Sequence, residues 1–377
     1  MQLSSRHSKS VTLETIVFVL FFTETKIIIP MEKRFNDSLQ HLMENWQQIV
    51  KKYQIPNTKI AIWQMITSFL PFIALWVLMY FSLSVSYWLT VGLALINAFF
   101  LVRIFIIQHD CGHQSFTKSR QLNNIIGFVC SGLSLIPYKY WAKAHNFHHG
   151  HCGRLEPDIR DIGDMPLLTV EEYRTMPTLY RLGYRLFRMP LILLSAGSFY
   201  YIFVHNRFVT IKQQGFSMVK KSLIWNNLYM VGIYVVGGLI FGFTTFLKIH
   251  LPIVLFFSVM AFFAFFIQHQ HEHAYKQWKN EWSYVMAALQ GSTYWKLPRV
   301  FQWLTGNIGI HHVHHLSSLI PNYNLQRCNE ENPAFQEIVT VVSFTDSMKL
   351  FLNKLWDEQQ QRMITFTEYR KLYGKTW

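Results

Sequence analysis

The stretch His145-Asn146-Phe147-His148-His149 places three histidines at positions i, i+3 and i+4. In a helix these three positions share one face, and their Cβ atoms lie about 5–6 Å apart. Three imidazoles this close together can hardly all be protonated, and solvation alone gives no reason to gather them. The spacing therefore indicates ligands for a metal ion that prefers nitrogen.

The same spacing recurs at His311, His314 and His315, and a further segment offers the i, i+4 pair His109 and His113. Because three separate segments carry the pattern, we expect the remainder of the chain to act as a scaffold that brings them together.

A fourth cluster, Gln268-His269-Gln270-His271-Glu272-His273, follows an apolar segment. On a continuous helix His269 and His273 share a face that His271 does not, and Glu272 could ligate or orient a neighbour. One ligand from this cluster brings the candidates to nine histidines. A zinc ion takes about four ligands, so nine imidazoles predict two metal ions. Imidazole suits iron, copper and zinc alike, so the spacing leaves the metal open.

A ligating imidazole needs its second ring nitrogen held by a polar partner. The candidates are the acidic and polar side chains close to the clusters in sequence: Asp110, Glu156, Asp158, Asp161, Asp164 and Asn307. The acidic run 156–164 also fits a solvated turn. His312 is one position out of register with its neighbours, so we expect it to point away from them.

The composition predicts a membrane protein. Of the 377 residues, 51% are hydrophobic and only 15% are charged, which is too apolar for an ordinary soluble domain of this length. The four cysteines form no CxxC pair and are typical of reduced cytosolic thiols. The net charge of +14 comes without a basic run or recognition motif for nucleic acid, so we assign it to membrane topology instead.

Four segments approach the length of about 20 apolar residues that crosses a bilayer. They are residues 60–83, 87–107, 223–246 and 251–267. The long segment between the second and third spans is rich in lysine and arginine, which predicts that it and both termini are cytosolic. All histidine clusters then meet just below the membrane. The predicted fold is an all-α integral membrane protein: four transmembrane helices and a helical cytosolic cap that carries a histidine-ligated dimetal site.

The regions outside the spans divide the chain into three parts. Residues 1–59 form an N-terminal extension, in which 1–30 are predicted to be a mis-assigned start and 37–54 an amphipathic helix in the membrane interface or packed on the protein. Residues 60–328 form the main domain, where 122–137 and 189–204 are predicted to be interfacial or half-inserted helices. Residues 329–377 form a cytosolic tail, with helical patterning over 344–369.

At the histidine clusters the chain resembles the membrane fatty acid desaturases. That family is marked by one box of HxxxH type and two of HxxHH type, which match 109–113, 145–149 and 311–315. The resemblance covers residues 60–328. The flanking segments Asp161-Ile162-Gly163-Asp164 and Trp303-Leu304-Thr305-Gly306-Asn307-Ile308-Gly309 resemble the bacterial acyl-lipid branch related to omega-6 (delta-12) enzymes.

The resemblance implies a centre of two iron ions that uses O2 and two electrons to remove hydrogen from adjacent methylenes of an acyl chain. It implies an additional histidine ligand near the end of the fourth span, best matched by His269, although His271 and His273 crowd that position. No His-Pro-Gly-Gly motif is present, so the electrons are expected from a separate donor, ferredoxin or a cytochrome b5-like protein. The expected location is the bacterial inner membrane, with acyl lipid or another acyl-chain carrier as substrate.

Other functions share some of these features. A histidine-box hydroxylase or a carotenoid-modifying oxygenase would carry the same clusters and differ in its substrate pocket. A metal transporter is a more distant alternative, because it needs ligands along a path through the membrane, whereas these histidines gather at one face.

Overall fold

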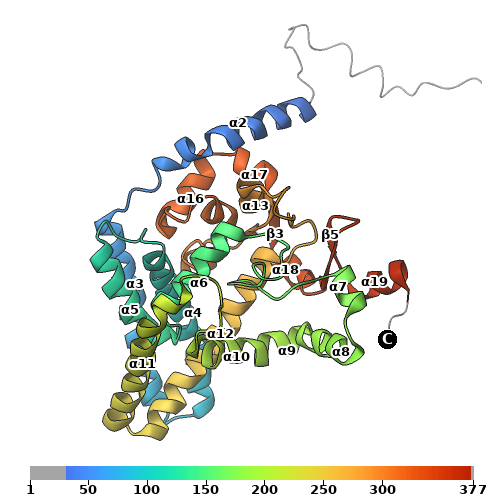
Figure 1. Cartoon of the computed structure of the whole chain (residues 1–377). Coiled ribbons are helices and arrows are strands. Elements are labelled where there is room, and N and C mark those ends of the chain that lie inside the picture. The colour runs from blue at the N-terminus through green and yellow to red at the C-terminus, as the bar shows by residue number, and fades with distance from the viewer. Residues whose placement is uncertain (1–30, 375–377) are drawn as a thin grey trace, which may run out of the picture.

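The computed structural model describes residues 31–374, and it describes side chains from residue 40 onward (Figure 1). The expectation for residues 1–30 lies outside this range. The long helices are α2 (Met31–Lys51), α3 (Thr58–Ser82), α4 (Tyr87–Gly112), α5 (Arg120–Ser134), α6 (Tyr138–His151), α11 (Lys220–Phe241) and α12 (Phe243–His269).

Shorter elements make up most of the cap. In chain order they are β1 (Leu168–Thr169), α7 (Val170–Thr175), α8 (Thr178–Phe187), α9 (Pro190–Ile192), the π-helix η1 (Leu193–Gly197), α10 (Ser198–Phe203), the 3₁₀ helices η2 (His205–Arg207) and η3 (Phe216–Val219), α13 (Tyr284–Gln290), β2 (Thr293–Lys296), α14 (Arg299–Leu304), α15 (His311–Leu316), α16 (Asn322–Glu331), α17 (Ala334–Ile338), β3 (Thr340–Ser343), α18 (Phe344–Leu350), β4 (Leu355–Asp357), β5 (Arg362–Ile364) and α19 (Phe366–Tyr373).

Within residues 31–374, four helices are long and apolar enough to cross a membrane: α3, α4, α12, and α11 together with the short η3 helix before it. Helix α4 packs against α3 and α12, and α11 packs against α12. The four spans lie together, with the cap gathered at one end of them (Figure 1). The predicted membrane fold is therefore confirmed.

The reversal between the last two spans lies earlier in the chain than expected. The predicted spans 223–246 and 251–267 leave a link at 247–250, which contains Lys248 and His250. In the structure the break is Gly242, whose φ of +81° is readily adopted only by glycine. His250 is instead buried inside α12, where its ring stacks on Phe246 with 5.4 Å between the ring centroids.

The segment 178–207 is long and apolar enough for a fifth span only if its two helical parts, Thr178–Phe187 and Pro190–Arg207, count as one. The axes of these two parts differ by 67°. Helix α8 buries none of its residues and carries Arg181 and Arg185 among exposed apolar side chains such as Leu179. A mixed apolar and basic surface is typical of a helix in the membrane interface. The sequence placed its interfacial helix at 189–204, directly after α8.

The apolar face of α2 packs on the cap. Leu42 and Val50 are buried in a cluster with residues of α13 and α15–α17, and the Trp46 ring lies 5.5 Å from the Tyr284 ring, between centroids. That face is therefore covered by protein. A helix in the membrane interface would need this face to contact lipid, so α2 is a helix packed on the protein.

The sequence predicted helical structure over 344–369, and this prediction is wrong for the central part of the segment. Helix α18 ends at Leu350, and β4 and β5 follow as an antiparallel pair, with β1 added parallel to β4. Leu355 and Trp356 are buried on opposite faces of this sheet, each in its own apolar cluster. The chain reverses at Gln361, which has a φ of +51°, so the apolar spacing that resembled a helix belongs to two short strands.

A buried arginine ties the tail to the rest of the cap. The Arg188 guanidinium donates to the Pro166 carbonyl (3.1 Å), to Oε1 of Gln270 (3.0 Å) and to the Asn353 carbonyl (2.8 Å). These acceptors precede β1, follow α12 and precede β4. One side chain therefore joins three segments that are far apart in the sequence.

Helix α5 approaches α6 through a glycine. A Cβ atom on Gly127 would lie 2.3 Å from the Tyr138 ring, at the first residue of α6. We expect Gly127→Ala to lower the free energy of unfolding by about 1–3 kcal/mol, because overpacking forces neighbouring groups apart. Thermal unfolding in detergent measures this effect. The matched control is Gly92→Ala in α4, where a Cβ atom meets nothing within 4 Å. Equal melting temperatures for the two variants would contradict the packing described here.

Candidate metal centre

Nine histidines that the sequence selected are buried together where the spans meet the cap. They come from the end of α4 and the residue after it, from α6, from the last residue of α12, and from α15. They are His109, His113, His145, His148, His149, His269, His311, His314 and His315. The three boxes and the fourth cluster thus converge in space, and they form two neighbouring groups.

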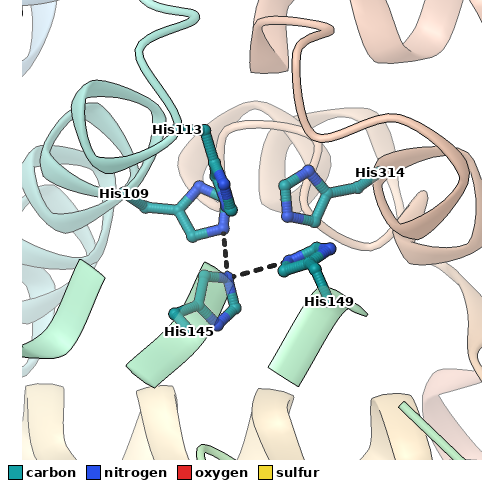
Figure 2. A group of neighbouring side chains, drawn as sticks. All are labelled: His109, His113, His145, His149 and His314. Atoms are coloured by element: carbon teal, nitrogen blue, oxygen red, sulfur yellow. Dashed lines mark hydrogen bonds between the residues drawn. The ribbon is translucent and has the colours of Figure 1, made fainter. Parts of the chain in front are cut away.

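The first group contains five histidines: His109, His113, His145, His149 and His314. One ring nitrogen from each lies within 4.8 Å of the others, and the rings face a common centre (Figure 2). Nε2 of His145 lies 3.0 Å from Nε2 of His109 and 3.1 Å from Nε2 of His149.

The second group forms around His269. Its Nε2 atom lies 3.2 Å from Nε2 of His148 and 3.0 Å from Nε2 of His311. Four residues each place one possible ligand atom within 4.8 Å of the others: His148, Cys152, His269 and His315.

Cys152 lies on the other side of the His269 ring. Its sulfur is 3.5 Å from Nδ1 of His269, and that same nitrogen lies 3.3 Å from the Gly291 carbonyl oxygen. A proton on Nδ1 directed at this carbonyl leaves the Nε2 lone pair facing His148 and His311. Cys152 was not among the residues predicted from the sequence, although it lies four residues after His148.

The chemistry of these residues fits a metal. Burial, reinforced by the neighbouring histidines, holds the pKa of His145, His149 and His315 well below the usual range. The rings are therefore neutral and carry lone pairs. Within the described part of the chain, both ring nitrogens of His314 and of His315 are buried without a hydrogen-bond partner. Unpaired buried polar atoms are costly, and a cation at the centre of each group would satisfy one nitrogen of each ring.

Side chains behind the rings fix their orientation. Oδ1 of Asp110 lies 3.0 Å from Nδ1 of His109, and Oδ2 of Asp110 accepts from the backbone and side-chain nitrogens of Asn322 at 2.6 and 2.8 Å. Oδ1 of Asn146 lies 2.7 Å from Nδ1 of His113. These contacts turn Nε2 of His109 and His113 toward the group, as partners of metal-binding histidines do.

Two further carboxylates of the acidic run lie in different environments. Asp164 is close to the site, with Oδ2 at 3.8 Å from Nδ1 of His148. Asp161 instead accepts a hydrogen bond from the Leu167 backbone and lies 3.6 Å from Arg160.

The other predicted partners are placed away from the rings. Asp158 is exposed, and Glu156 bonds Arg154, so this part of the run is a surface turn. Asn307 has a φ of +59° and donates to the Asn322 carbonyl, so it supports the residue that holds Asp110.

The fourth cluster departs from the expected helix. Helix α12 ends at His269, so His273 does not continue its face and is exposed. Glu272 is exposed too and pairs with Arg362 at 3.0 Å. His271 is buried but lies in neither group. Of this cluster, the structure brings His269 alone to the site.

Two apolar cavities meet at the histidines. The larger has a volume of about 610 Å³ and runs between α4, α12 and the cap, with His109, His145 and His311 in its wall. The smaller, of about 220 Å³, lies beside α6 and α10. Both are lined by five common residues: Phe105, Trp141, His145, Ala261 and Phe265. An extended apolar molecule that occupied both would pass directly beside His145.

The fold and the site define a helical membrane protein with a buried polyhistidine centre beside an apolar passage. A family model described as fatty acid desaturase matches residues 86–342. This match covers more than half of the chain, and the protein belongs to the fatty acid desaturase family.

Relatives with known names agree with this membership. The chain is 39% identical over 329 residues to a fatty acid desaturase of Bacillus subtilis, covering 87% of this chain and 92% of that protein. It is 28% identical to an sn-1 oleoyl-lipid 12-desaturase of Synechocystis, over 63% of this chain and 65% of that protein. It is also 28% identical to an endoplasmic-reticulum omega-3 fatty acid desaturase of Vigna radiata, over 68% of this chain and 64% of that protein.

His312, which lies beside the second group without belonging to it, allows a test of burial. His312 points away from its neighbours, as expected, and its Nε2 lies 3.1 Å from Oδ1 of Asn329. Burial lowers its pKa from the ordinary 6.5 to about 3. Below pH 6.5 the unfolded chain therefore binds a proton that the folded protein does not. The free energy of unfolding should fall by about 2 kcal/mol for this group between pH 7.5 and pH 5.

Denaturant unfolding of the metal-free protein at these two pH values measures this loss. His312→Gln should reduce it by about 2 kcal/mol, whereas His41→Gln, at an exposed histidine of α2, should leave it unchanged. An identical pH dependence in His312→Gln and the unmodified protein would contradict the assignment.

Proposed function

We propose that this desaturase holds two iron ions and introduces a double bond into acyl chains esterified in membrane lipid. One observation carries the proposal: two groups of neutral, buried imidazoles adjoin each other where two apolar cavities meet. A metal site and a place for a long apolar substrate are thereby combined.

The ligands divide between the two ions according to the nitrogen contacts. His109, His113, His145, His149 and His314 would hold one ion. His148, His269, His311 and His315 would hold the other, since Nε2 of His269 faces His148 and His311. Iron held by these imidazoles would activate O2, the oxidant that removal of two hydrogens from unactivated methylenes needs, and two electrons from a donor would complete the reduction of O2 to water.

The protein's own residues position the substrate and keep water away. Phe105, Trp141 and Phe265 form the walls at the junction of the cavities, and His145 lies in the same wall. An acyl chain held between these rings presents a fixed pair of carbons to the site. Such positioning and exclusion of water are the contributions a protein makes to cofactor chemistry.

The mouth of the larger cavity supports a substrate that arrives from the membrane. Three residues of its lining, Phe301, Phe344 and Met348, are also 43%, 58% and 55% exposed. Exposed apolar side chains around a cavity suit contact with lipid better than contact with water. The cyanobacterial relatives named sn-1 oleoyl-lipid 12-desaturase act on a lipid-linked chain, in agreement with this substrate class.

The electrons are proposed to come from a separate carrier, ferredoxin or a cytochrome b5-like protein. The net charge of +14 favours an acidic carrier. We place the protein in a bacterial inner membrane with the histidines and both termini in the cytosol. Labelling of single cysteines at positions 85 and 180 checks this: 85 should react from outside and 180 only after permeabilisation.

The metal assignment is tested by composition. Purified protein should contain about two iron atoms per chain, because nine imidazoles exceed the needs of one ion. His148→Ala and His314→Ala should each lower the iron content and abolish desaturation. His312→Ala, the neighbour that faces Asn329, should retain both iron atoms. Full iron content in His148→Ala would refute the ligand assignment.

The substrate is tested in a bacterial host without desaturases. Expression should produce new unsaturated acyl chains, and the His314→Ala variant should produce none. After a pulse of labelled acyl chains, the double bond should appear first in phospholipid. Its earlier appearance on CoA or carrier protein would reject the lipid-linked substrate, while a hydroxylated product would reject desaturation itself.

A further inference from the structure

A third hollow lies apart from both cavities, in a groove between α5, the start of α6 and the start of α11. Its volume is about 550 Å³, and none of its lining residues lines either cavity. One wall is apolar and consists of Ile125, Phe128 and Val129. The rim is polar and includes Asn124, Lys139 and Ser222.

The apolar wall belongs to an exposed apolar stripe of α5. Helix α5 begins at Arg120 and then exposes Leu122, Ile125 and Val129 at helical spacing, with 49%, 52% and 45% of each residue exposed. A helix that is basic at its start and apolar along its exposed stripe lies with that start at the membrane surface.

Helix α11, which packs against α5, shows the same order of residues. Lys220 and Lys221 are exposed at its start, and Ile224 and Trp225 follow with 50% and 68% exposure. Tryptophan is favoured at the boundary between head groups and hydrocarbon. The two helices therefore set the groove with its polar rim at the membrane surface and its apolar wall below.

The fixed charges around the groove are all positive. No aspartate or glutamate occurs between Asp110 and Glu156, or between Glu172 and Glu272, and these intervals contain all of α5, α6 and α11. Basic side chains lie in the lining, at Lys139, and at or just before the starts of α5 and α11, at Lys118, Arg120, Lys220 and Lys221. A ligand with a negative head group and an apolar chain matches this arrangement at both ends.

We propose that the groove binds an anionic phospholipid that is not the substrate. Its phosphate would lie at the rim beside Lys139, and one acyl chain would lie along Ile125, Phe128 and Val129. The assignment rests on the charge and polarity of the groove, and it does not depend on the identity of the metal or of the substrate.

A lipid in this groove would brace the helix that carries the second histidine box. Tyr138 lines the groove, and its hydroxyl donates to the Cys111 carbonyl at 2.8 Å, between His109 and His113 in the sequence. The same residue begins α6, which carries His145. Occupancy of the groove should therefore raise the thermal stability of the protein.

Native mass spectrometry of the full chain tests the proposal, with phosphatidylglycerol and phosphatidylcholine of identical acyl chains as probes. The protein should retain phosphatidylglycerol in preference. Lys139→Gln and Lys221→Gln should each weaken this binding about fivefold, the factor for one basic residue near a membrane surface. Phosphatidylglycerol should also raise the melting temperature of the unmodified protein more than that of either variant.

The matched control is Lys371→Gln, at an exposed lysine of α19, which lies across the molecule from α5 and α11 (Figure 1). It should bind phosphatidylglycerol as the unmodified protein does. Equal retention of the two lipids, or equal weakening in Lys371→Gln, would overturn the proposal. Retention of an acidic ferredoxin without a lipid preference, lost in Lys139→Gln, would also overturn it and identify a protein-docking surface instead.

Discussion

The structure depends on one constraint: imidazoles can be packed this closely inside apolar protein only if they stay neutral. Protonation would place several positive charges within 5 Å of one another without water to screen them, which costs far more than folding provides. Neutral rings present lone pairs instead. Once Asp110 and Asn146 hold the outer nitrogens of His109 and His113, the Nε2 lone pairs turn inward. The scaffold of spans and cap serves to maintain this geometry.

The sequence was most informative where spacing alone decides geometry. The intervals of three and four residues in 145–149 and 311–315 fix which histidines share a helix face, and all six histidines reach the site. Spacing did not show that each triplet is divided between the two groups. The apolar spans were predictable for a similar reason, because bilayer thickness sets their length. His312 was excluded by its register, and the structure turns it toward Asn329.

Other features depend on backbone breaks and tertiary contacts that the sequence shows only weakly. The end of α12 at His269 removes His273 from the helical face on which spacing placed it. The chain reverses between the last two spans at Gly242, and not at the predicted link that contains Lys248 and His250. Cys152 became visible as a neighbour of His269 only after α6 and α12 had been placed together.

The contact between Asp110 and Asn322 has a consequence for biosynthesis. The two residues are 212 positions apart, yet their hydrogen bonds set the ring of His109. Spans such as α3 and α4 can enter the membrane while the ribosome is still translating. The histidine site remains incomplete until the last third of the chain has left the ribosome and folded onto the first third. The histidine site therefore forms late in biosynthesis. A truncated chain that inserts correctly into the membrane would still lack the complete site.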